Sequence, residues 1–137
     1  MSPSVNHSYI CTKIIEHLLK REGIQPFVEL TLDIDKGMTP DISVYRENSI
    51  RPDFLEDKTR CDIIPLLAIE ILSPTQGIQE LVDKAKILLA AGVSTVWIVD
   101  TYARTVIVVS NEKKETFHRE LVDCEGIKVD FREVFIS

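Results

Sequence analysis

Glu70 is the most informative residue in the sequence. It lies within residues 66–72, a run that is otherwise entirely apolar. Such a run is typical of a strand that is buried on both faces of a sheet. Because an ionised carboxylate carries a large desolvation cost in that setting, it is usually paired, bound to metal or catalytic. Glu70 is therefore predicted to be a functional residue, with a structural ion pair to a buried lysine or arginine as the alternative.

Asp41 is the second candidate. It follows Pro40, whose ring fixes the backbone at the entrance to the alternating segment 41–45. If that segment pairs with the strand that carries Glu70, two carboxylates meet at one end of the sheet, where they repel unless a cation lies between them. Mg²⁺ suits such a pair because it takes few protein oxygens and keeps several waters. Asp53 forms a second Pro-Asp pair, but no alternation follows it, so it is expected to be a loop residue.

Two lysines lie where they can reach the edge of such a site. Lys84 falls on one flank of the apolar stripe of a predicted helix over residues 77–91, and Lys86 falls on the other. Either stem can lie along apolar surface and carry its ammonium group to a site at the edge. The periodicity does not choose between them.

The elements before Glu70 follow from hydrophobic periodicity. Apolar side chains recur on one side of residues 7–22, which predicts a helix that Gly23 ends. Alternation predicts strands over residues 27–33 and 41–45. The connection over residues 46–62 is polar and irregular, and a connection of that length is often functional or mobile.

The second half continues the pattern. Ser73-Pro74-Thr75 supplies helix-start chemistry before the helix over residues 77–91. Two further strands are expected over residues 96–99 and 106–109, and a capping box at residues 130–133 predicts a short final helix. The order of helix, three strands, helix and more strands indicates an α/β (α+β) fold, with a mixed β-sheet flanked by α-helices.

Composition limits the class of protein. The 137 residues, 45% of them apolar and 28% charged, predict a single folded domain over residues 1–137. Residues 1–6 lack the basic start and apolar run of a signal peptide, and no apolar stretch is long enough to span a membrane. The cysteines Cys11, Cys61 and Cys124 show no disulfide or zinc spacing. A cytoplasmic protein with reduced thiols and no membrane partner is expected.

Charge and the remaining polar residues add little further chemistry. A net charge of −6 argues against a broad basic surface that coats nucleic acid, but clustered carboxylates can still attract a metal. His7, His17 and His118 lack metal-ligand spacing and are expected to be surface or packing residues. Trp97 is expected in the core, and the charged run over residues 112–115 is expected in a solvated hairpin.

A series of motifs in a fixed order resembles one protein family. The motifs are Met38-Thr39-Pro40-Asp41-Ile42-Ser43-Val44, Leu67-Ala68-Ile69-Glu70-Ile71-Leu72-Ser73-Pro74-Thr75, Asp83-Lys84, Gly92-Val93 and Val96-Trp97-Ile98-Val99-Asp100. Over about residues 7 to 110 the series resembles the Uma-two family of restriction endonucleases, a branch of the PD-(D/E)XK nuclease superfamily. The resemblance implies a restriction endonuclease-like fold and Mg²⁺- or Mn²⁺-dependent hydrolysis of DNA.

The resemblance also implies a role for each residue. Asp41 and Glu70 match the metal-binding acids, and the carbonyl of Ile71 would be a third ligand. The superfamily usually has lysine two residues after the second acid, where this chain has Leu72; Lys84 matches a lysine moved to the following helix. Glu29 resembles a further acidic residue that some members use near the metal.

Two departures and the acidic charge keep other functions open. Leu88 stands where many relatives have tyrosine, and Gln79 stands where an acid is common. A catalytically inactive nuclease fold that binds nucleic acid or protein is therefore the second hypothesis. A purely structural ion-pair cluster is the third. A homodimer would suit cleavage of both DNA strands, since symmetry places one site against each strand.

Overall fold

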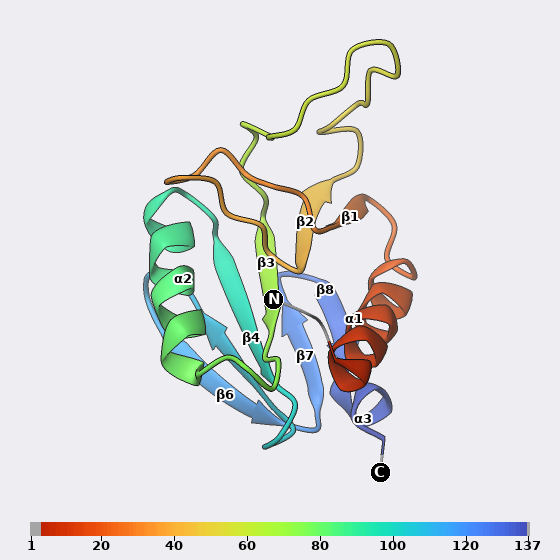
Figure 1. Ribbon diagram of the computed structural model, residues 1–137. Helices are drawn as coiled ribbons and strands as arrows, with labels where there is room; N and C mark the ends of the chain where they lie inside the picture. Colours follow the sequence, from red (N-terminus) through yellow and green to blue (C-terminus); the bar gives the residue numbers. More distant parts are fainter. Residues whose placement is uncertain (1–3, 137) are drawn as a thin grey trace.

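The computed structural model describes residues 4–136. Its helices and strands in chain order are α1 (Val5–Leu18), β1 (Ile24–Val28), β2 (Ile42–Arg46), β3 (Leu67–Ile71), α2 (Ile78–Ala90), β4 (Thr95–Asp100), β5 (Thr105–Val109), β6 (Lys114–His118), β7 (Leu121–Cys124), β8 (Ile127–Asp130) and α3 (Phe131–Val134). Within the described residues, six strands form one sheet in the order β1 to β6, and β7 pairs with β8 separately (Figure 1).

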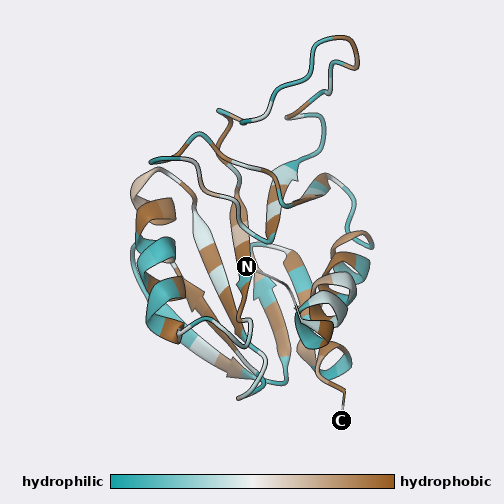
Figure 2. Cartoon of the chain, in the orientation of Figure 1, coloured by the Kyte–Doolittle hydropathy of each residue, from teal (hydrophilic) through white to brown (hydrophobic). Residues whose placement is uncertain are grey.

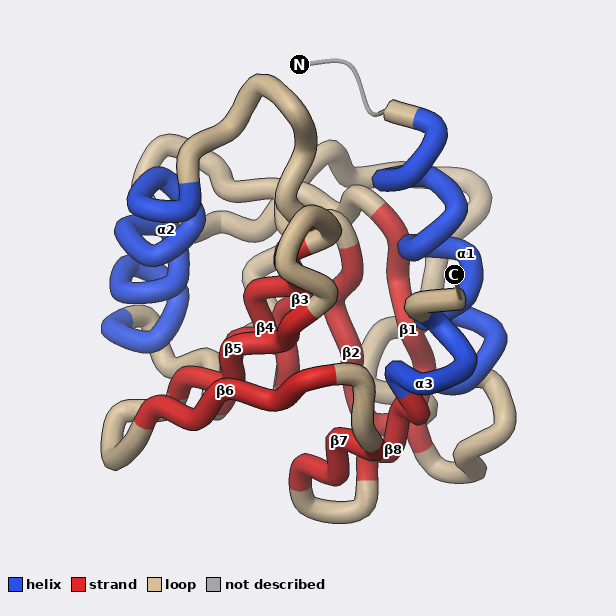
Figure 3. The backbone as a smooth tube through the Cα atoms, turned by 90° about the horizontal axis from the view of Figure 1, so that it is seen from below, coloured by secondary structure: helices blue, strands red, loops and turns tan. Residues whose placement is uncertain are grey.

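The large sheet is mixed, as predicted. β3 and β4 are parallel and are connected through α2, whereas each of the other neighbouring strands pairs antiparallel. α2 covers one face of the sheet, and α1, α3 and β8 pack against the other (Figure 3). The predicted mixed sheet with flanking helices is confirmed. The strand that carries Glu70 lies inside the sheet, with β2 on one side and β4 on the other.

The core consists of two apolar clusters, one on each face of the sheet. Alternate residues of β3 supply both clusters, because Ile69 packs toward α1 and Ala68 toward α2. The hydropathy colouring shows β3 and β4 as largely apolar and α2 as polar on one side (Figure 2). Trp97 is fully buried, which confirms its predicted place in the core. No helix among residues 4–136 has the length and apolar character needed to cross a membrane.

α1 begins and ends earlier than the sequence predicted. Its buried side is formed by His7, Ile10, Ile14 and Leu18. The helix ends at Leu18, and Gly23, with φ of 84°, lies in the turn before β1 rather than at the helix end. The cause is burial, since the residues that follow Leu18 are exposed and add nothing to the apolar face.

Ser4 caps α1, and its removal should have a measurable cost. The Ser4 Oγ accepts the backbone N–H of His7 at 3.1 Å. Ser4→Ala is expected to lower the free energy of unfolding by about 1 kcal/mol, because an orphan donor of the first turn loses its partner. Ser8→Ala, on the exposed side of the same helix, is the matched control. Equal denaturation midpoints for the two variants would contradict a stabilising role for the Ser4 cap.

The first strand lies earlier than the alternation predicted. β1 covers Ile24–Val28 and pairs with β2, whereas the prediction of a strand over residues 27–33 was wrong beyond Val28. The chain leaves the strand at Glu29, whose φ of 49° breaks the extended conformation. Leu32 is buried through an isolated bridge to Met38, so its apolar character reflects a packed loop rather than a strand.

Residues 47–66 form a long segment that we call the arm. It follows the end of β2 and extends away from the sheet (Figure 1). Apart from a bridge at Cys61 it is irregular, as predicted, and it exposes Phe54 and Leu55 almost completely. Asp53 accepts the backbone N–H of Leu55 at 3.0 Å, which is the behaviour of the loop residue expected from the sequence.

The later elements largely follow the sequence. α2 begins at Ile78 with Gly77 as its N-cap, so Ser73-Pro74-Thr75 precedes the helix by a short turn rather than starting it. Its buried residues are Leu81, Ala85, Leu88 and Leu89. Asp130 caps α3 by accepting the N–H of Arg132 at 3.0 Å, and the charged run over residues 112–115 is exposed at the β5–β6 turn, both as predicted.

Candidate active site

The pairing of β2 with β3 brings Asp41 and Glu70 together. The register places Ile42 opposite Ile69, so Asp41, one residue before β2, comes beside Glu70. The backbone N–H of Ile71 donates to the Asp41 Oδ2 at 2.7 Å, which fixes the carboxylate against the end of β3. The condition stated from the sequence, that the two strands must be neighbours, is therefore met.

Glu70 is buried inside the sheet and has a cationic partner. Its side chain is 3% exposed, and the Lys84 Nζ lies 3.1 Å from its Oε2. Burial raises the pKa of Glu70 to about 7; the charge of Lys84 acts in the opposite direction, and the charge of Asp41 raises it further. Near neutral pH the Glu70 carboxyl is therefore present in both its protonated and its ionised form. A cation bound beside it would lower its pKa and favour the ionised form.

The structure distinguishes the two candidate lysines. Lys84 lies on the side of α2 that faces β3, and its ammonium group reaches Glu70 while 29% of the side chain remains exposed. Lys86 is exposed on the outer surface of the helix. The geometry therefore favours Lys84, which periodicity alone could not do. We refer to Asp41, Glu70 and Lys84 together as the carboxylate–lysine site.

Glu29 lies beside this site but does not join its ion pair. Its backbone N–H donates to the backbone oxygen of Asp41 at 3.1 Å, and its positive φ is rare for a residue with a long side chain. Within residues 4–136 no ion pair links Glu29 to Lys84. Glu29 and Asp41 instead line a small open cavity of about 140 Å³ together with residues of α1.

The electrostatics of this small cavity favour a positive ligand. Cys11 of α1 lines it, and the pKa of its thiol is raised to about 11 by burial first and then by the charges of Asp41 and Glu29. The thiol is therefore neutral at physiological pH, so it is a poor nucleophile and a poor thiolate ligand. The charges of Asp41 and Glu29, which add to the effect of burial on the Cys11 pKa, would also attract a cation.

His7 is the residue at this site that the sequence interpretation missed. Expected to be a surface or packing residue, it is 8% exposed, and its Nε2 lies 3.2 Å from the Asp41 Oδ2. The available signal was its position, because His7 falls on the same helical stripe as Ile10 and Ile14, just after a capping serine. Metal-ligand spacing between histidines was the wrong criterion for a histidine that contacts an aspartate.

The donor set suits a hard divalent cation such as Mg²⁺. Asp41 and Glu70 supply carboxylate oxygens, which Mg²⁺ prefers. The N–H of Ile71 points to Asp41, and the carbonyl of a strand residue projects from the same edge as its N–H, so the Ile71 carbonyl is directed to that side too. The described residues contain no cluster of three histidine, cysteine or acidic side chains arranged as a metal site. A metal site built from two carboxylates and a backbone carbonyl does not need three such side chains.

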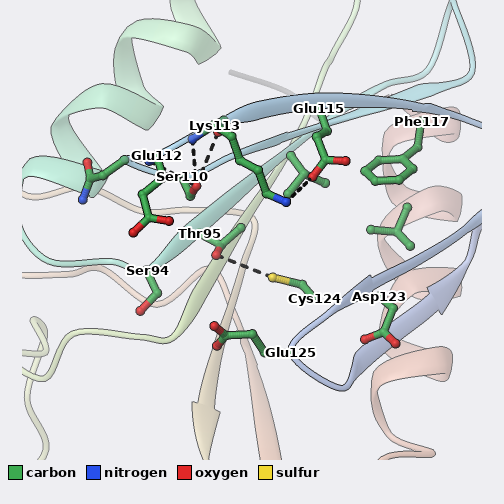
Figure 4. Close-up of a pocket in the computed structure, with 13 residues that line it drawn as sticks. Ser94, Thr95, Ser110, Glu112, Lys113, Glu115, Phe117, Asp123, Cys124 and Glu125 are labelled. Atoms are coloured by element: carbon green, nitrogen blue, oxygen red, sulfur yellow. Dashed lines mark hydrogen bonds and ion pairs between the residues drawn. The ribbon is translucent and has the colours of Figure 1, made fainter.

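A larger cavity lies elsewhere and lacks these residues. It measures about 460 Å³ and lies between the β5–β6 turn and the β7–β8 turn (Figure 4). Glu112, Glu115 and Asp123 line it, and its Lys113 is paired with Glu115 at 2.8 Å. An acidic pocket whose lysine is already paired is unsuited to a phosphate anion, so size alone does not identify the functional site.

The fold and the site define a restriction endonuclease-like α/β protein. A family model described as Uma2, "Putative restriction endonuclease", matches residues 1–131, and the chain belongs to this family. A crystal structure of "a putative nuclease belonging to DUF820" from Anabaena variabilis ATCC 29413 is 25% identical and superposes with a TM-score of 0.82, over 98% of this chain and 83% of that chain.

Two further comparisons are less informative. A cryo-EM structure of a DrdV–DNA complex aligns with 91% of this chain and 12% of that chain at 13% identity, and its TM-score of 0.42 is too low to establish a common fold. No curated protein matches this chain.

Proposed function

We propose that this protein is a metal-dependent endonuclease that hydrolyses phosphodiester bonds of DNA, with Mg²⁺ or Mn²⁺ held by Asp41, Glu70 and the carbonyl of Ile71. The observation that carries the proposal is the carboxylate–lysine site itself. A buried glutamate lies beside a second acid and 3.1 Å from a partly exposed lysine. Membership of the family described as "Putative restriction endonuclease" supports the same reaction. The PD-(D/E)XK pattern supplies the roles of the two acids.

Each residue has a role that follows from its position. A bound divalent cation would supply Lewis-acid stabilisation of the phosphate and a lowered pKa for an attacking water. The backbone N–H of Ile71 holds the Asp41 carboxylate at the end of β3, where it would bind the cation. The Lys84 side chain is partly exposed, so its ammonium group can contact a phosphate oxygen or the attacking water as well as Glu70. Glu29 adds negative charge at the edge of the site.

The first test is metal binding. Purified, metal-free protein is titrated with Mn²⁺ by calorimetry, and the wild type is expected to bind. Asp41→Asn is expected to abolish measurable binding, because it removes the charge of a ligand. Asp53→Asn is the matched control, because Asp53 also follows a proline but lies in the arm, beyond the opposite end of β2.

The second test is cleavage by the same preparations. Nicking of supercoiled plasmid DNA is expected for the wild type and Asp53→Asn in Mg²⁺, and for neither in chelator. Cleavage by Asp41→Asn at the wild-type rate would refute the proposed site. If the wild type binds Mn²⁺ but cuts neither DNA nor RNA, the inactive binding module becomes the better description. If it binds no metal, the cluster is a structural ion pair.

A further inference from the structure

His7 is held in place by the start of α1. Its backbone N–H donates to the Ser4 Oγ at 3.1 Å, and its side chain is only 10% exposed. Ile10 and Ile14, on the same side of the helix, pack in the core beside β3. The cap therefore holds the backbone of His7, and the packing of Ile10 and Ile14 holds the helix that follows it.

The imidazole contacts one oxygen of Asp41. His7 Nε2 lies 3.2 Å from the Oδ2 that also accepts the Ile71 N–H at 2.7 Å. A carboxylate oxygen only accepts, so this close approach is favourable when Nε2 carries a proton. An imidazole nitrogen from a helix and a backbone N–H from a strand thus both lie against the same oxygen.

We propose that His7 is a positioning residue for Asp41. By holding Oδ2, His7 and the Ile71 N–H prevent rotation of the carboxylate and leave Oδ1 as the oxygen available to a cation. Without the His7 contact, the Ile71 N–H alone would hold a side chain that is 20% exposed. Partners that orient a metal-binding carboxylate typically change metal affinity by about 10- to 100-fold when they are removed. This inference rests on the metal site proposed above.

The experiment compares two amides at position 7. The amide nitrogen of glutamine reaches about as far as Nε2, whereas that of asparagine corresponds to Nδ1 and falls short of Asp41. In a Mn²⁺ titration by calorimetry, His7→Asn is expected to weaken binding about tenfold, and His7→Gln to restore most of the wild-type affinity. His17→Asn is the matched control, because His17 lies on the same helix but approaches Glu133 rather than Asp41.

The outcomes separate this inference from the proposed function. Wild-type affinity in His7→Asn, or equal weakening in His7→Asn and His7→Gln, would overturn the role of His7 alone. Tighter binding by His7→Asn would also overturn it, because His7 would then compete with the cation. Absence of Mn²⁺ binding by the wild type would overturn both. Thermal unfolding in chelator checks that each variant is folded, and His7→Leu replaces His7→Asn if the latter is not.

Discussion

Replacing Lys84 with methionine is expected to slow DNA cleavage by about 100- to 1,000-fold, the usual effect of removing one group that stabilises transition-state charge. Methionine keeps the length and apolar character of the stem, so packing along α2 is preserved. The lost group is the ammonium that lies 3.1 Å from Glu70. Cleavage rates are measured on supercoiled plasmid at saturating Mg²⁺.

Lys86→Met is the control for the Lys84 prediction. It makes the same substitution two residues away on the same helix, but on the exposed side. Its cleavage rate should stay near that of the wild type, and both variants should still bind Mn²⁺, since neither lysine is a ligand. Equal rates for Lys84→Met and the wild type would assign the activity to another site or to a contaminating nuclease.

Glu70 is expected to make the stability of the metal-free protein depend on pH. In the folded state its pKa is raised to about 7 from an ordinary value of 4.5, so the folded protein holds a proton that the unfolded chain releases. The stabilisation from this proton is complete below about pH 4.5 and is lost as the pH rises through 7. The shift corresponds to about 3 kcal/mol over that range.

The measurement compares the wild type with Glu70→Gln in chelator between about pH 5 and pH 8. Glutamine keeps the shape of the protonated acid and cannot ionise, so the stability advantage of the wild type over the variant should shrink as the pH rises. Glu112→Gln, at an exposed glutamate, is the matched control and should show no such trend. A constant difference between wild type and Glu70→Gln would contradict the raised pKa.

The predictability of the site differed from residue to residue. Glu70 stood out as a candidate from one strand alone, because a charge in an apolar run violates the ordinary rule of burial. Asp41 needed one further fact, the pairing of β2 with β3, which local pattern does not determine. Lys84 and Lys86 lie on opposite flanks of one stripe, so only the packing of α2 on the sheet could separate them.

The errors in the fold have a common physical cause. Over residues 27–33 and at the end of α1, local pattern indicated regular structure that the tertiary packing did not continue. Leu32 is buried without belonging to a strand, and Leu19 is apolar without being buried. His7 was missed for the related reason that its partner, Asp41, is distant in the chain. Periodicity reports which side of an element is buried, but not what lies against it.

The arm and the carboxylate–lysine site lie at opposite ends of β2. Asp41 precedes the first residue of this strand, and the arm follows its last residue. Strand β2 thus separates the carboxylate–lysine site, whose geometry is fixed by packing, from the exposed arm. Surface loops tolerate insertion and sequence change far better than packed elements do. Insertions and substitutions in the arm are therefore expected to leave the geometry of the carboxylate–lysine site unchanged.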